Sequence, residues 1–141
     1  MEDHKVSFEL AVLAKEKGFR EYTATGYAQN GDIYLHQGGQ ESVITGQKYF
    51  EGSSYKGSPF LCSRPTQSLL QKWLREVHDL EIHISCVTQH NEVKKSCKLV
   101  HYQYFVKSKS QYYFIRIENE GFKTYELALE DALLESLKLI K

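Results

Sequence analysis

Apolar residues recur with helical spacing in three segments of the chain, and each segment begins with residues that favour a helix N-terminus. The first follows Ser7 and ends at Gly18, the second begins at Pro65 or Thr66, and the third follows Thr124. Ser and Thr are preferred at this position because their hydroxyls accept a hydrogen bond from a free N–H of the first turn. Apolar positions three and four residues apart lie on one helical face. The pattern therefore predicts three helices.

Other segments alternate between apolar and polar residues with the period of two that is typical of strands with one buried face. Residues 22–36 hold Asn30-Gly31 between two such runs, and this dipeptide is the strongest short signal for a hairpin. Three later segments also alternate: 80–86, 99–106 and 112–117. Their connections are short, so they are expected to form an antiparallel meander, with a polar loop at 89–98 between its first two strands.

Strands grouped together with helices over one face define an α+β protein. We therefore predict an antiparallel sheet, made of the N-terminal hairpin and the three-stranded meander, that is packed by two or three helices. The length of 141 residues fits a single domain over residues 1–141.

Composition narrows the classes of function. The 18 basic and 18 acidic side chains give a formal net charge of 0. The chain therefore lacks the excess of positive charge expected of a general nucleic-acid or membrane-surface binder. Three cysteines cannot pair completely, which favours a reducing compartment. No apolar run approaches the roughly 20 residues that a membrane span requires, and the charged amino terminus lacks the apolar stretch of a signal peptide. We expect a cytoplasmic protein that makes no membrane contact.

A glycine-rich and aromatic stretch at residues 37–63 leads into the second helix and is the best candidate for a binding loop. The helix that follows begins with a cation, hydroxyls and free backbone amides, and the N-terminus of a helix attracts anions. Capping alone also explains Thr66 and Ser68. The residues expected to bind a small anionic ligand are Arg64, Thr66, Gln67, Ser68, Tyr55 and Phe60.

Two cysteines and two histidines are spaced as C-x3-H-x6-C-x3-H, at Cys86, His90, Cys97 and His101. This set has the composition of a tetrahedral zinc site. Residues four apart on an extended strand are about 13 Å apart, however, so the four could share a metal only if the strands bend sharply. We therefore predict no bound metal and no cofactor, and keep this set as the weaker alternative.

Two further patterns suggest chemistry without completing a site. Cys62 precedes the second helix, whose positive end would lower the thiol pKa and make a nucleophile, but no residue is assignable as the group that orients a histidine base. Lysines also lie near tyrosines and could form a small surface that binds a phosphate and stacks a nucleic-acid base. Lysine is, however, common on edge strands, where it prevents pairing with other chains. These residues are Lys94, Lys95, Lys98, Lys107 and Lys109, with Tyr102, Tyr104 and Tyr112.

Residues 65–78 read Pro-Thr-Gln-Ser-Leu-Leu-Gln-Lys-Trp-Leu-Arg-Glu-Val-His. This segment resembles the signature helix of an uncharacterised family of short proteins in phages and prophages of gut anaerobes. Residues 13–19 and 124–140 are similar to the opening and closing helices of that family. The resemblance implies a phage or mobile-element accessory protein in the host cytoplasm, and it assigns no catalytic residue.

The leading hypothesis is a non-enzymatic binding protein that captures a host factor or a small anionic, nucleotide-like ligand through residues 37–63 and the start of the second helix. One alternative is a small hydrolase or nucleotide-modifying enzyme that uses Cys62 or a histidine. A second alternative is a structural homodimer built on the final helix.

Overall fold

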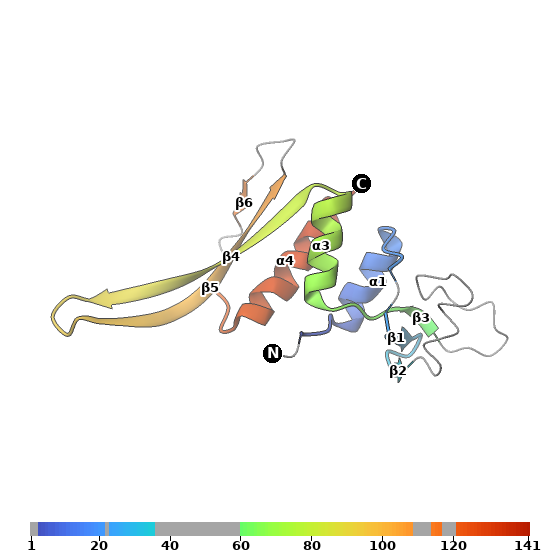
Figure 1. Cartoon of the computed structure of the whole chain (residues 1–141), viewed down its shortest axis with the longest axis horizontal. Helices are drawn as coiled ribbons and strands as arrows, with labels where there is room; N and C mark the ends of the chain where they lie inside the picture. Colours follow the sequence, from blue (N-terminus) through green and yellow to red (C-terminus); the bar gives the residue numbers. More distant parts are fainter. Residues whose placement is uncertain (1–2, 22, 36–59, 109–113, 117–120) are drawn as a thin grey trace. The chain divides into compact units, whose positions relative to one another are not determined.

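The computed structural model describes residues 3–21, 23–35, 60–108, 114–116 and 121–141 (Figure 1). These residues contain both helices and antiparallel strands, which confirms the α+β class. The elements are α1 (Phe8–Glu16), β1 (Thr25–Ala28), β2 (Ile33–Leu35), β3 (Phe60–Ser63), α3 (Gln67–Val77), β4 (Leu80–Asn91), β5 (Ser96–Ser108), β6 (Phe114–Arg116) and α4 (Tyr125–Leu139).

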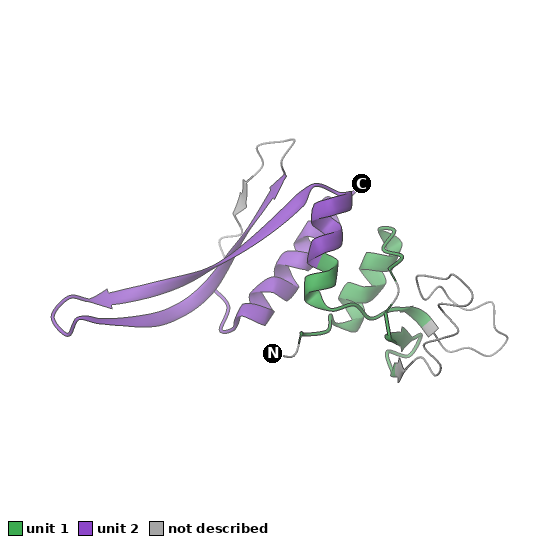
Figure 2. Ribbon diagram, viewed as in Figure 1, with its two compact units in different colours: residues 1–70 green, residues 71–141 purple. Residues whose placement is uncertain are grey.

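The chain divides into two compact units, Met1–Leu70 and Gln71–Lys141, and the division falls within α3 (Figure 2). Each unit has its own antiparallel sheet. The prediction that the hairpin and the later strands share one sheet is therefore wrong. The single domain over residues 1–141 stays a prediction.

In the first unit, α1 begins and ends where its sequence predicts. The Oγ of Ser7 accepts a hydrogen bond from the Leu10 N–H at 3.3 Å. Gly18 follows the helix with a φ of +97°, a left-handed conformation that glycine adopts without steric cost. Leu10 and Ala14 on the inner face are buried.

The sheet of the first unit has the order β2-β1-β3. The turn at Asn30-Gly31 joins β1 to β2, and the Gly31 N–H donates to the Ala28 carbonyl at 3.0 Å. β3 pairs with the other edge of β1, at the end of the stretch interpreted as a binding loop. Residues 37–59, which make up the rest of that stretch, lie outside the described residues.

The sheet of the second unit has the order β4-β5-β6. β4 and β5 pair from Leu80↔Ser108 to Asn91↔Ser96, with one register shift after Val87. The polar loop predicted at 89–98 is therefore wrong, because most of those residues belong to the two strands. Their polarity did not prevent pairing, since backbone hydrogen bonds hold the ladder and polar side chains remain in water.

α4 covers only the base of this hairpin. The helix begins at the N-cap Thr124, whose hydroxyl accepts from the Leu127 N–H at 3.2 Å. It contacts both β4 and β5, and the outer part of the hairpin extends beyond it (Figure 1). Leu133 and Leu137 are completely buried on its inner face. None of the described helices is long and apolar enough to cross a membrane.

Candidate binding surfaces

The start of α3, where an anion site was predicted, is occupied by other parts of the first unit. The Thr66 hydroxyl accepts from the Leu69 N–H at 3.1 Å, which is a capping bond. The Gln67 N–H donates to the His4 carbonyl at 2.7 Å, and the Ser68 hydroxyl donates to the carboxylate of Asp3 at 2.8 Å. These donors are therefore engaged within the chain, and an acidic side chain already lies beside them.

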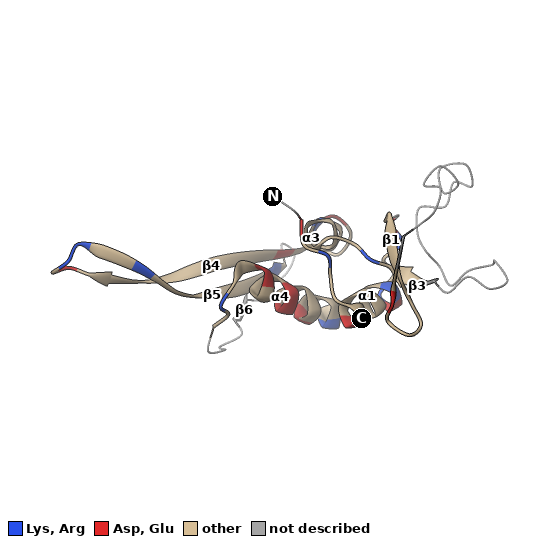
Figure 3. Cartoon of the chain, turned by 90° about the horizontal axis from the view of Figure 1, so that it is seen from below, with Lys and Arg blue, Asp and Glu red and all other residues tan. Residues whose placement is uncertain are grey.

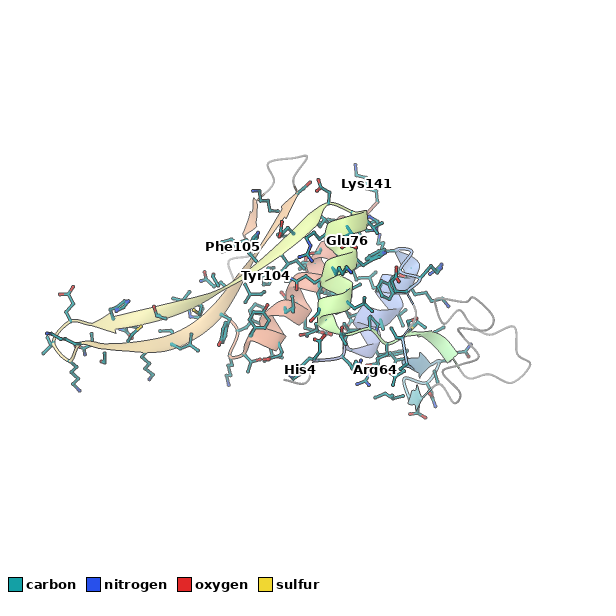
Figure 4. The ribbon with its side chains drawn as sticks, viewed as in Figure 1. His4, Arg64, Glu76, Tyr104, Phe105 and Lys141 are labelled. Atoms are coloured by element: carbon teal, nitrogen blue, oxygen red, sulfur yellow. The ribbon has the colours of Figure 1, made fainter. Side chains whose placement is uncertain are left out.

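Arg64, the cation of the predicted site, is directed to a tyrosine on the neighbouring strand. Its Nε donates to the Tyr27 hydroxyl at 3.2 Å, and its Cζ lies 5.5 Å from the centre of the same ring. The Tyr27 hydroxyl in turn donates to the Val6 carbonyl at 2.6 Å. The guanidinium thus helps hold β1 against β3 (Figure 4).

Two residues of the predicted anion site are not placed by these contacts. Tyr55 lies outside the described residues, and Phe60 is described only as the first residue of β3. The structure brings Arg64, Thr66, Gln67 and Ser68 together along consecutive backbone. The anion-binding role of this set stays a prediction, whereas the capping role of Thr66 is observed.

Cys62, the candidate nucleophile, lies on β3 opposite Tyr27 and is completely buried. Burial raises the pKa of its thiol to about 11, because the charged thiolate would lose its hydration. The nearby Lys15 acts in the opposite direction but does not overcome burial; its Nζ donates to the Leu61 carbonyl at 2.7 Å. The expected lowering of this pKa by the following helix is therefore wrong, and the thiol is neutral at pH 7.

His78, at the end of α3, is a half-buried titratable group. Its Nε2 is buried and has no hydrogen-bond partner among the residues that the structure describes, and its ring meets Trp73 edge-on with ring centres 4.5 Å apart. Burial lowers the pKa of His78, since the imidazolium would be poorly solvated there. A neutral ring against Trp73 is a packing arrangement.

The register of β4 and β5 separates the four predicted metal ligands. His90 lies directly opposite Cys97, and the Sγ and Nε2 atoms are 4.0 Å apart. Cys86 lies opposite Tyr102, two pairs further along the same face. His101 lies opposite Val87, and this pair projects from the other face of the hairpin. Within the residues that the structure describes, no three His, Cys, Asp or Glu side chains are grouped to hold a metal ion. A four-ligand site within one chain is therefore wrong, but two of its members do meet.

The outer part of the hairpin, residues 88–100, is named the arm here. Every residue of the arm is exposed, including Val93 at 94%, Leu99 at 45% and Val100 at 52%. The turn is closed by the Lys94 N–H, which donates to Asn91 Oδ1 at 3.1 Å. Side chains project from both faces of the arm (Figure 4).

The arm is also the basic end of the second unit. Three lysines and one glutamate give it a formal charge of +2, and Figure 3 shows the basic positions near its tip. Four acidic side chains lie instead on α4, at Glu126, Glu130, Asp131 and Glu135 (Figure 3). The two surfaces thus have opposite charge within a chain whose net charge is 0.

Of the tyrosines expected beside these lysines, Tyr102 and Tyr104 differ in exposure, whereas Tyr112, like Lys109, lies outside the described residues. Tyr104 is 2% exposed, and its hydroxyl donates to Asp131 Oδ2 at 2.6 Å. Burial and this hydrogen bond raise its pKa strongly. Tyr102 is half-buried and packs edge-on against Tyr125, with ring centres 6.3 Å apart. Tyr104 is therefore part of the core and is not a platform for stacking a base.

These features define an α+β protein with an exposed, two-stranded β arm. No family model, curated protein or solved structure matches the chain. Its function is therefore argued from its own residues. Sequence reasoning missed the arm because apolar and polar residues do not alternate regularly along it. The available signals were the turn after Asn91 and the β-branched residues Thr88, Val93 and Val100.

Proposed function

We propose that this chain is a non-enzymatic binding protein that contacts another protein chain through its arm. The observation that carries the proposal is the exposure of every residue from Thr88 to Val100. A two-stranded hairpin is at best marginally stable in water without a third strand or a helix against it. The arm has neither within the described residues, so a partner that covers it would supply the missing burial.

The composition of the arm fits a protein partner. Val93, Leu99 and Val100 offer apolar area, and the lysines around them form a polar rim, which is the usual anatomy of a protein interface. Exposed strands also bind other chains by extending a sheet. A host factor, as implied by the resemblance at residues 65–78, and a second copy of this chain are both protein partners of this kind.

The other hypotheses have less support from the geometry. The neutral thiol of Cys62 is a poor nucleophile, because the thiolate is the reactive form. The start of α3 uses its hydroxyls and the Gln67 amide within the chain, which reduces the attraction of this end for an anionic ligand.

The test compares a variant of the arm with a variant of α4. Leu99→Ser with Val100→Ser removes apolar area from the arm, and Leu127→Ser with Leu139→Ser changes residues of similar exposure, 54% and 42%, on the helix. Each purified variant is immobilised, and the protein it retains, including free copies of the same chain, is quantified. We expect the arm variant to bind at least about tenfold more weakly and the helix variant to bind normally.

Melting temperature is measured for both variants to confirm that they are folded. Equal binding by the arm variant and the unaltered chain would contradict the proposal. So would an equal loss in the helix variant.

A further inference from the structure

The pairing of β4 and β5 places a thiol and an imidazole side by side near the end of the arm. His90 and Cys97 are directly opposed, and opposed residues of an antiparallel pair project from the same face. Both side chains are exposed, and Cys97 is a free thiol. No backbone movement is needed to bring them together.

Their separation is close to that of two ligands on one zinc ion. With Zn–S near 2.3 Å, Zn–N near 2.0 Å and a tetrahedral angle, the sulfur and nitrogen would be about 3.5 Å apart. The observed distance from Sγ to Nε2 is 4.0 Å. Small rotations of two exposed side chains close this difference.

One arm supplies only half of a tetrahedral set. Structural zinc sites have four ligands, and the described residues gather no third His, Cys, Asp or Glu here. A two-fold axis brings the same patch of two copies together, so that each pair meets its equivalent. The result is two thiolates and two imidazoles, a ligand set typical of structural zinc.

The lysines of the arm are compatible with this arrangement when the two arms run antiparallel across the axis. Lys94 and Lys95 lie in the turn, roughly 10 to 13 Å beyond the His90–Cys97 pair at 3.4 Å per residue. The two turns then point in opposite directions, roughly 20 to 25 Å apart, which exceeds the screening length of about 8 Å at physiological salt. Lys98 follows Cys97 and projects from the opposite face.

The same face offers apolar cover for a second arm. Thr88 and Leu99 form the next pair on this face of the hairpin, and Cys86 and Tyr102 form the pair after that. In the antiparallel arrangement, the turn of one copy lies over these pairs of the other. Leu99, 45% exposed in the single chain, is thereby buried.

We propose that His90 and Cys97 form half of a tetrahedral zinc site and that the same two residues of a second copy complete it. This inference rests on the proposed function, because it names the chain that the arm contacts. The metal supplies the directional bonds, and the apolar pairs beside it supply the buried area.

The test uses the full chain, reduced with a phosphine that does not compete for metal. Zinc chloride is titrated while molar mass is followed by sedimentation velocity, and Co²⁺ in place of Zn²⁺ reports the ligands through its visible spectrum. We expect one metal per two chains, a shift from monomer to dimer that a chelator reverses, and a Co²⁺ spectrum typical of tetrahedral thiolate coordination.

Variants distinguish this site from general binding to cysteine or histidine. Cys97→Ser and His90→Gln should each weaken metal-dependent dimerisation at least about tenfold. The matched controls His83→Gln and His101→Gln change imidazoles that project from the other face of the same hairpin and should dimerise normally. Saturation at one metal per chain without dimers, or an equal loss in the controls, would overturn the site.

A chelator separates failure of this inference from failure of the proposed function. If binding to another protein depends on Leu99 and Val100 in the presence of chelator and zinc forms no dimer, the zinc site is wrong and the binding function of the arm remains. If neither zinc-dependent dimerisation nor binding to another protein depends on the arm, the zinc site and the binding function are both wrong.

Discussion

The two halves of the β4–β5 hairpin share one antiparallel register but differ in what covers them. In the inner half, Ile82, Tyr104 and Val106 are at most 4% exposed, where α4 contacts both strands. In the outer half, the arm, every side chain is exposed. Backbone pairing therefore extends the strands through both halves, whereas burial against the helix stabilises only one. The uncovered half is the part available to a partner.

The largest expected effect is a difference between apolar truncations in the two halves. Ile82→Ala removes buried methyl groups of the inner half and should lower the free energy of unfolding by about 2 to 5 kcal/mol. Leu99→Ala in the arm should lower it by less than about 0.5 kcal/mol, because that side chain is already hydrated. Urea unfolding of both variants measures this difference, and equal losses would show that the arm is as well covered as the base.

A smaller effect is expected for the hydroxyl that joins the inner half to α4. Tyr104→Phe removes the donor to Asp131 and should lower the free energy of unfolding by about 1 to 1.5 kcal/mol. Tyr102→Phe is the matched control, since that ring lies at the border of the arm and packs against Tyr125. An equal change in both variants would mean that the Tyr104 hydrogen bond adds no specific stability.

The smallest effect is expected at the turn of the arm. Lys95 has a φ of +48°, a left-handed conformation that is strained for residues with a β-carbon. Lys95→Gly should relieve this strain and raise the free energy of unfolding by about 0.5 to 1 kcal/mol. A loss of stability in urea unfolding would contradict the turn geometry.

Features fixed by neighbouring residues were predictable from the sequence. Ser7 and Thr124 cap helices because each hydroxyl reaches an amide three residues away. Asn30-Gly31 forms its turn because glycine adopts the positive φ that the turn requires. In each case the signal and the structure lie within a few residues of one another.

Features set by distant pairing were not predictable. The environment of Cys62 depends on its pairing with Tyr27, and nothing near Cys62 in the sequence indicates that contact. Likewise, the register of β4 and β5 decides that His90 meets Cys97 while Cys86 and His101 project from opposite faces. The residue types of the candidate metal site were visible in the sequence, but their grouping was not.

Amide hydrogen exchange of the free chain, at a concentration where it is monomeric, tests the division of the hairpin most directly. The amides of Glu81, His83, Gln103 and Phe105, whose N–H groups point from one strand to the other, should exchange slowly, because α4 must leave before the strands of the base separate. Those of the arm should exchange much faster and become protected only when a partner covers it. Equal, slow exchange along the whole hairpin of the free chain would contradict an uncovered arm.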